Sequence, residues 1–147
     1  MSNNRPIPPE EFRAIYSRVP RLSIDLVIER QGKILLVQRA LPSYKGQWHL
    51  PGGTLLFKES IEHAIRRIAK DEVGLTVEPG QLLGYITYLS EEKERGYGYT
   101  IGLAFRCQWV AGEPQVNEEG NAAEIFSKLP RKTIVEQEQF LHTIGYA

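Results

Sequence analysis

Two carboxylates close a helical segment whose inward positions are otherwise apolar. Residues 51–75 read PGGTLLFKESIEHAIRRIAKDEVGL, with Asp71 and Glu72 in the last helical turn and Ile68 where a third carboxylate would complete a cluster. At about 100° per residue, Glu72 falls on the same face as Ile68. Burying an isolated charge is costly, so Glu72 requires a cation, an arginine or strong hydrogen-bond donors beside it. Asp71 follows Arg67 by four residues, so a surface ion pair and ligand binding are both open for Asp71.

A Pro-Gly-Gly turn precedes this helical segment. Pro51 fixes its own φ, whereas Gly52 and Gly53 let the backbone bring its carbonyl groups close to a ligand. A hard cation such as Mg²⁺ takes oxygen ligands from one or two carboxylates, from carbonyl groups and from substrate phosphates. The segment therefore favours a Mg²⁺ site that joins Glu72 to the glycine turn, and a structural salt bridge of Glu72 is the alternative.

The elements that must position these groups follow from periodicity and turn residues. Ser60 is an expected N-cap and Gly74 an expected C-cap of a helix over 61–73. The remaining pattern predicts helices over 8–19 and 136–145, strands over 22–29, 33–39, 81–90 and 99–110, and a short strand within 117–129. A mainly β centre with helices packed against it indicates an α/β sandwich.

Composition limits the function classes. The chain has 147 residues, which suits one domain over 1–147, and its 18 basic residues balance 18 acidic ones. Net charge therefore gives no support to binding of nucleic acid or of a membrane surface. The single cysteine, Cys107, fits a strand and excludes an internal disulfide, which favours a cytoplasmic protein.

The spacing of the charged helix resembles the Nudix box, which runs Gly, five residues, Glu, seven residues, Arg-Glu-hydrophobic-any-Glu-Glu-any-Gly-hydrophobic. The residues at this spacing, within about 53–75, are Gly53, Glu59, Arg67, Asp71, Glu72, Gly74 and Leu75, with Asp71 as a conservative replacement of a glutamate. The resemblance implies an α/β/α sandwich around a mixed β-sheet, and a hydrolase for nucleoside diphosphates linked to another group. It also implies Mg²⁺ (or Mn²⁺) at Glu72, with Asp71 and the Gly52 carbonyl as further ligands. Glu59 and Arg67 are expected to hold the loop to the helix, with Gly53 and Gly74 in structural roles.

Ile68 departs from the box, because it replaces the glutamate that follows the arginine. The GDP-mannose mannosyl hydrolases lack the same glutamate and release GDP and a hexose by substitution at the sugar C1, and the chain is most similar to them over roughly 8–110. That resemblance implies that Asp25 contacts the sugar or nucleotide. It implies that Arg39 binds the substrate and steadies the departing diphosphate.

The resemblance weakens directly after the Gly-Gly pair and again in the late loop. Thr54 stands where the subfamily has an arginine, while Asn121 and Gly120 stand where it has a histidine base and a metal-binding glutamine. Asparagine cannot accept a proton as a base near neutral pH. A glutamate close by could serve as base or as an extra metal ligand, and Glu119 is our choice among Glu118, Glu119 and Glu124.

Two further segments carry candidates. His49 precedes the glycine turn and could approach a ligand, although a packed histidine is its more ordinary role. The polar segment 91–98, with Lys93 and Arg95, is expected to be a mobile loop that covers a ligand. A base-stacking platform could come from the aromatic residues Trp48, Tyr85, Tyr88, Tyr97 and Tyr99.

Three functions are open at this point, each with a small-molecule nucleotide as ligand. The first is a nucleotide-sugar hydrolase in which water attacks the sugar carbon. The second is a pyrophosphohydrolase in which Asp71, Glu72 and a late-loop glutamate rebuild a metal cluster. The third is a non-catalytic nucleotide-binding module, because Ile68 and Asn121 are both losses. Enzymes of this kind are commonly dimers, so a homodimer is expected.

Overall fold

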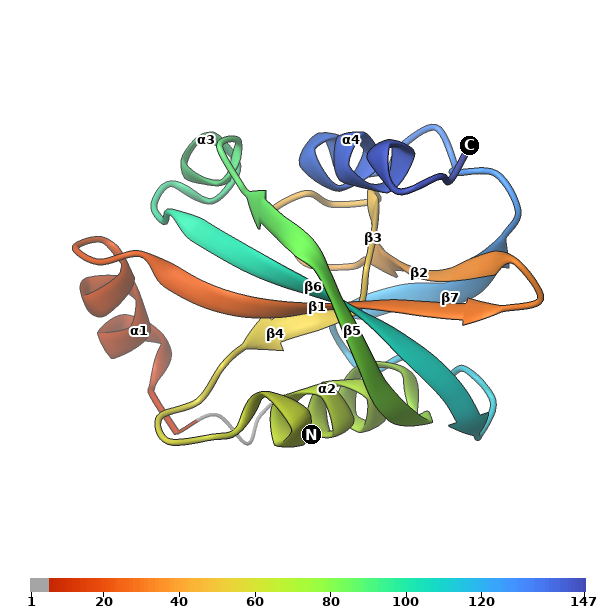
Figure 1. The fold of residues 1–147 in the computed structure, drawn as a ribbon. Coiled ribbons are helices and arrows are strands. Elements are labelled where there is room, and N and C mark those ends of the chain that lie inside the picture. The colour runs from red at the N-terminus through yellow and green to blue at the C-terminus, as the bar shows by residue number, and fades with distance from the viewer. Residues whose placement is uncertain (1–5) are drawn as a thin grey trace.

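Seven strands form one mixed β-sheet with helices packed on both faces, as a computed structural model of the chain shows for residues 6–147 (Figure 1). The elements in chain order are α1 (Pro9–Tyr16), β1 (Arg21–Arg30), β2 (Lys33–Arg39), β3 (Trp48–His49), β4 (Gly52–Thr54), α2 (Ile61–Val73), β5 (Thr76–Thr87), α3 (Glu91–Arg95), β6 (Thr100–Ala111), β7 (Gly120–Phe126) and α4 (Val135–Thr143). In Figure 1, α2 lies below the sheet, and α3 and α4 lie above it. The expected α/β/α sandwich is confirmed.

Beyond their shared turn, β1 and β2 diverge, and each of them pairs with a further strand. The main strand order is β3-β2-β1-β6-β5, with β4 paired to β1 and β7 paired to β2. β1 and β2 share only the pairs Glu29↔Ile34 and Arg30↔Lys33 next to their tight turn, while β1 runs parallel to β6 along its length. The beginning of β1 is therefore free to pair with β4, which places Asp25 opposite Gly52.

β1 is buried on both faces, so it lies at the centre of the fold. Ile24 and Leu26 belong to the core cluster that contains the buried side chains of α2. Val27 belongs to the other cluster, with Leu141 of α4. Side chains alternate between the faces of a strand, so Asp25 shares a face with Val27. A carboxylate therefore occupies a position that the pattern of burial reserves for an apolar side chain.

α2 has the predicted bounds and both predicted caps. The Ser60 hydroxyl accepts a hydrogen bond from the His63 N–H over 3.1 Å, and Gly74 adopts a left-handed φ of 69°. The buried face of the helix carries Ala64, Ile65, Ile68, Ala69 and Val73. Local sequence thus fixes the element that carries Asp71 and Glu72.

Two predictions were wrong in detail. β5 begins at Thr76 and not at residue 81, because Pro79 and Gly80 continue the strand with register shifts instead of ending it. Proline is tolerated there because β5 is an edge strand. The segment 91–98, expected as a loop, begins with α3, and the first residue of that helix, Glu91, is buried.

Within residues 6–147, every helix is too short or too polar to cross a membrane.

Candidate active site

One cavity of about 1290 Å³ collects the residues that the sequence marked as functional. It opens between the start of β1, the Gly-Gly strand β4, the end of α2 and the loop before β7. Its walls include Asp25, Arg39, Gly52, Asp71, Glu72 and Glu119. Positions spread over most of the chain therefore meet at a single concave surface.

Gly52 and Gly53, expected in a loop, form strand β4, and Glu72 joins this strand to the end of α2. The Gly52 N–H donates a hydrogen bond to Glu72 Oε1 over 3.2 Å, and both residues are half-buried. Asn117 ties the late loop to the same helix end, because its amide Nδ2 donates to the Asp71 carbonyl over 3.1 Å. The side-chain oxygen of Asn117 then accepts from the Glu119 N–H over 2.9 Å. Asn117, which sequence reasoning missed, thus positions Glu119 relative to Asp71 and Glu72.

The Ile68 side chain packs against Gly53 of β4. Its side chain is only 2% exposed, and a Cβ added to Gly53 would lie 3.4 Å from Ile68 Cγ1. The isoleucine therefore fills the space under the turn with hydrocarbon, and the cavity has no carboxylate at this position.

Arg67 and Glu59 connect the loop before α2 to the helix. Arg67 Nε donates to Glu59 Oε2 over 2.7 Å, Nη2 donates to Oε1 over 2.9 Å, and Nη2 also donates to the Thr54 carbonyl over 3.0 Å. Burial alone would raise the pKa of Glu59. The hydrogen bonds from Arg67, the Leu56 N–H and His63 outweigh burial and lower that pKa to about 2. The ion pair, together with the bond to the Thr54 carbonyl, therefore holds the end of β4 against α2.

Arg39 is fixed at the edge of the cavity by its own loop. Its Nε donates to the Ser43 carbonyl over 2.5 Å, and Nη2 donates to Ser43 Oγ over 2.9 Å. Burial and the nearby Arg95 lower the pKa of the Arg39 guanidinium. Glu119 and Glu72 act in the opposite direction, so both carboxylates are near enough to feel its charge. A held guanidinium beside two carboxylates suits an anionic ligand that also brings a cation.

Asp25 ends a buried chain of hydrogen bonds. The Leu50 N–H donates to Gln137 Oε1 over 2.7 Å, Gln137 Nε2 donates to Tyr88 Oη over 2.9 Å, and Tyr88 Oη donates to Asp25 Oδ2 over 2.6 Å. Burial raises the pKa of Asp25 to about 6, while the Tyr88 hydrogen bond and Arg21 act against the rise. Asp25 is therefore held in one orientation at the cavity wall. Gln137 and Tyr88 gave no signal in the sequence that linked them to Asp25.

Glycine residues make room for the Asp25 carboxylate on two sides. A Cβ on Gly52 would lie 2.5 Å from Asp25 Oδ1, and a Cβ on Gly102 of β6 would overlap Asp25 Oδ2. Any side chain at either position would displace the carboxylate or the neighbouring strand. Gly52 is therefore required for packing as well as being a possible carbonyl ligand.

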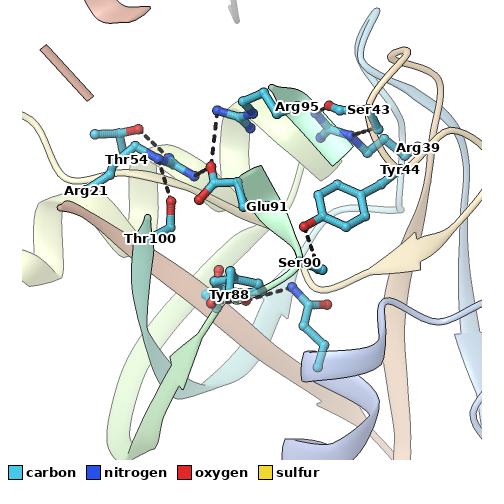
Figure 2. Close-up of polar contacts among 12 residues, drawn as sticks. Arg21, Arg39, Ser43, Tyr44, Thr54, Tyr88, Ser90, Glu91, Arg95 and Thr100 are labelled. Atoms are coloured by element: carbon cyan, nitrogen blue, oxygen red, sulfur yellow. Dashed lines mark hydrogen bonds and ion pairs between the residues drawn. The ribbon is translucent and has the colours of Figure 1, made fainter. Parts of the chain in front are cut away.

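Arg21 brings a guanidinium to the position where Thr54 departs from the expected arginine. Arg21 Nη1 donates to Thr54 Oγ1 over 2.7 Å, and Nε donates to Thr100 Oγ1 over 3.1 Å (Figure 2). Burial is the largest cause that lowers the pKa of Arg21. The guanidinium comes from β1 instead of β4, which a motif read along the chain cannot show.

The family follows from comparison with known proteins. A NUDIX domain matches residues 19–141. The chain belongs to the Nudix family. It is 33% identical over 114 residues to the ADP-ribose pyrophosphatase of Methanocaldococcus jannaschii, covering 76% of this chain and 66% of that protein. It is 40% identical over 78 residues to the low-salt glycan biosynthesis protein Agl8 of Haloferax volcanii, covering 53% and 50%.

A solved Nudix structure shows the same arrangement of elements. The MutT NUDIX hydrolase of Burkholderia pseudomallei superposes with a TM-score of 0.77 at 26% identity, over 86% of this chain and 99% of that chain. The chain spans less than two thirds of the length of the two curated relatives named above.

Nudix hydrolases generally use divalent metal ions, and the oxygen groups at this cavity fit such an ion. Within residues 6–147, no three His, Cys, Asp or Glu side chains already converge as a ligand set. Mg²⁺ does not need one, because it commonly keeps several waters and binds through one or two carboxylates plus substrate phosphates. Glu72 and Asp71, with Gly52 between them and β1, supply that kind of incomplete oxygen set.

The late loop of this Nudix chain offers one cavity-facing carboxylate. Glu119 and Gly120 line the cavity, whereas Glu118, Asn121 and Glu124 are exposed and lie outside its lining. The Ala40 N–H donates to the Glu119 carbonyl over 2.9 Å, which joins Glu119 to the end of β2 beside Arg39. Glu119 therefore lies at the cavity wall near Arg39.

His49 lines the cavity, but its ring is hydrogen-bonded to the backbone of the next residue. Its Nδ1 lies 2.7 Å from the Leu50 carbonyl, which requires a proton on Nδ1. Burial lowers the pKa of His49 to about 4, so the ring is neutral near pH 7. Among the proposed stacking aromatics, Tyr88 is buried against Asp25 and Tyr97 lines the cavity.

Proposed function

We propose that this protein is a divalent-metal-dependent hydrolase of nucleoside diphosphate derivatives, that its substrate is a nucleotide sugar such as GDP-mannose, and that water attacks the sugar carbon. One observation carries the proposal. Arg39, Glu72 and Glu119 meet at one cavity, while the position that would extend the carboxylate cluster is the buried Ile68. Attack at phosphorus usually draws on more than one metal ion, whereas attack at carbon needs the diphosphate only as a leaving group.

Glu72 would hold Mg²⁺ (or Mn²⁺) together with the Gly52 carbonyl and Asp71. The ion would supply positive charge to the diphosphate oxygens. Arg39, whose orientation Ser43 fixes, would bind the same diphosphate and stabilise the charge that develops as it leaves.

The proposed bond changes balance within the site. The water oxygen bonds to the sugar carbon, the bond from that carbon to the diphosphate oxygen breaks, and the diphosphate departs with the electron pair. Glu119 would accept the proton of the attacking water, since Asn121 lies outside the cavity and cannot act as a base. Asp25, oriented by Tyr88, would bind a sugar hydroxyl or the nucleotide.

Pyrophosphohydrolase activity is the second candidate. The relative at 33% identity is named an ADP-ribose pyrophosphatase, and Asp71, Glu72 and Glu119 all line the cavity. A substrate diphosphate could draw these carboxylates around more than one ion. In that case the products would be a nucleoside monophosphate and a phosphorylated partner.

Isotope analysis separates the two reactions. The protein is incubated with Mg²⁺, ¹⁸O-labelled water and a panel that includes GDP-mannose, other nucleotide sugars and ADP-ribose, and the products are examined by mass spectrometry. Label in the free sugar, beside unlabelled nucleoside diphosphate, is the expected result. Label in a phosphate-bearing product assigns attack at phosphorus. Binding without turnover across the panel identifies a nucleotide-binding module and overturns both reactions.

We also propose a single-domain cytoplasmic homodimer. The edge strand β5 exposes Leu82 at 50% and Tyr85 at 68%, which is apolar surface beside unpaired backbone groups. Sedimentation velocity tests the assembly, and a monomer at micromolar concentration would remove it. The buried, unpaired Cys107 supports a reducing compartment.

A further inference from the structure

Glu91 is a buried carboxylate with one oxygen left over. The residue is 3% exposed, and its Oε1 is a fully buried atom with no hydrogen-bond partner among the described residues. Its Oε2 lies 3.8 Å from Arg21 Nη2 and 3.4 Å from Arg95 Nη1, as Figure 2 shows. Buried polar atoms are almost always satisfied, and leaving an acceptor without a partner is costly. An unpaired Oε1 therefore destabilises the ligand-free protein, and a ligand that donates a hydrogen bond to Oε1 would remove this cost.

The surroundings of Glu91 are shaped around the carboxylate. A Cβ on Gly98 would lie 2.8 Å from Glu91 Cδ, so only glycine leaves room for the carboxylate there. Arg95, on the last turn of the same helix, stands with its guanidinium carbon 5.6 Å from the centre of the Tyr97 ring. Glu91, Arg95 and Tyr97 all line the cavity of the candidate active site. The residue that carries the unpaired oxygen is thus part of the cavity wall.

This wall lies beside Arg39, whose pKa the nearby Arg95 lowers, and it extends to Arg21 at the start of β1. Arg21 begins β1, and Asp25, which pairs with Gly52, lies four residues further along. Four residues of extended strand span about 13 Å, so Arg21 lies well along β1 from the position that pairs with Gly52. An ionised carboxylate can only accept, so the group that reaches Glu91 Oε1 must be a hydrogen-bond donor, which an ionised phosphate oxygen is not.

We propose that Glu91 Oε1 accepts a hydrogen bond from the non-phosphate part of the substrate, and so determines which nucleoside diphosphate derivative is bound. The inference rests on the proposed function, since it places the diphosphate at Glu72 and Arg39. The donor is a hydroxyl of the attached sugar, or a hydroxyl or N–H of the nucleoside. Arg21 and Arg95 hold Oε2, so Oε1 is the carboxylate oxygen left to accept a hydrogen bond from a ligand.

Binding measurements with Glu91→Gln test this role. Glutamine has the same shape but lacks the charge, so the hydrogen bond to a ligand donor is weakened by about 10-fold in affinity. Calorimetry in Mg²⁺ compares inorganic pyrophosphate, GDP, ADP, GDP-mannose and ADP-ribose. Pyrophosphate has no neutral donor, so its affinity should not fall in the variant. Glu92→Gln, an exposed residue of the same helix, is the matched control and should bind every probe as wild type does.

The pattern of losses identifies the donor. Weaker binding of GDP or ADP assigns it to the nucleoside, whereas loss confined to GDP-mannose or ADP-ribose assigns it to the attached sugar. An equal loss for all probes, pyrophosphate included, would make Glu91 a structural residue and overturn the inference. Glu91→Asp, which keeps the charge but withdraws it by one methylene, should repeat the selective loss if Glu91→Gln does not fold. Failure of wild type to bind pyrophosphate would instead count against the proposed function.

Discussion

Tyr88 Oη donates a hydrogen bond of 2.6 Å to Asp25 Oδ2, and this bond joins the end of β5 to the central strand. Gln137 of α4 donates to the same tyrosine oxygen, so the orientation of Asp25 depends on three elements that meet only in the folded chain. Burial nevertheless disfavours the charged carboxylate and raises the pKa of Asp25 to about 6. Asp25 therefore couples the site to the stability of the protein.

Asp25→Asn should flatten the dependence of stability on pH. The folded protein binds a proton at Asp25 below about pH 6 and the unfolded chain only below about pH 4, so this stabilisation is complete below pH 4 and is lost as pH rises through 6. A shift of this size corresponds to roughly 3 kcal/mol between pH 4 and pH 8. Urea unfolding at several pH values measures it. Glu78→Gln, at an exposed ion pair, is the control and should keep the wild-type slope.

Glu59→Gln should weaken the ion pair that holds the end of β4 against α2. Glutamine cannot pair with Arg67 by charge, so the free energy of unfolding should fall by about 2 kcal/mol at pH 7. The pKa of Glu59 is lowered to about 2, so its contribution is present above about pH 4.5 and is lost as pH falls through 2. Thermal unfolding measures the loss, with the exposed Glu62→Gln on α2 as control. Equal melting temperatures for both variants would show that the pair does not stabilise the fold.

Local signals predict α2, whereas the site depends on contacts between distant segments. Ser60 and Gly74 mark the ends of the helix because capping is a property of a few neighbouring residues. Tyr88 and Gln137 are 49 positions apart, and their contact depends on the packing of α4 against the sheet. Strand periodicity gives the face of a residue but not its partner on another element. Glu72 could therefore be named from a motif and Asp25 and Arg39 from a resemblance, but their companions in the fold could not.

Glu91 shows the same limit for charged segments. The run EEKERGYG predicts a solvated loop because it opens with an unbroken series of charged residues and contains no aliphatic side chain. In the fold, Arg21 and Arg95 lie beside Glu91 and Gly98 leaves space for it, so one carboxylate is buried. Composition cannot show which member of a charged run faces inward.

Arg39→Lys should reduce turnover more than substrate binding. Lysine keeps the charge but loses the two hydrogen bonds that Arg39 makes with Ser43, so the cation is no longer held against the leaving diphosphate. We expect kcat to fall by about 100-fold, within the range for loss of one oriented electrostatic contact. Steady-state kinetics with the best substrate of the panel measures it. Arg66→Lys, on the exposed face of α2, should retain wild-type kcat, and a similar loss there would contradict a specific role for Arg39.

Glu72→Gln should remove metal-dependent activity without unfolding the protein. The amide can still accept the hydrogen bond from the Gly52 N–H, but it is a much weaker ligand for a hard cation. We expect kcat/KM to fall by roughly 100-fold or more, since even residues that only support a metal ligand cost up to that amount. Activity is measured against Mg²⁺ concentration, with Glu62→Gln as the control on the same helix. Wild-type activity at saturating Mg²⁺ would show that Glu72 is not a required ligand.

Ile68→Glu tests why the apolar residue is present. A carboxylate under the Gly53 turn would be buried without a partner, so the metal-free variant should lose about 3 kcal/mol of stability. Mg²⁺ should restore part of this loss, because the introduced carboxylate would stand one helical turn before Glu72 and add an oxygen ligand. In labelled water, a larger share of ¹⁸O should then enter phosphate-bearing products. Ile68→Met, which preserves an apolar side chain of similar volume, should show neither effect. If Mg²⁺ stabilises Ile68→Glu no more than wild type, the isoleucine does not set the metal content of the site.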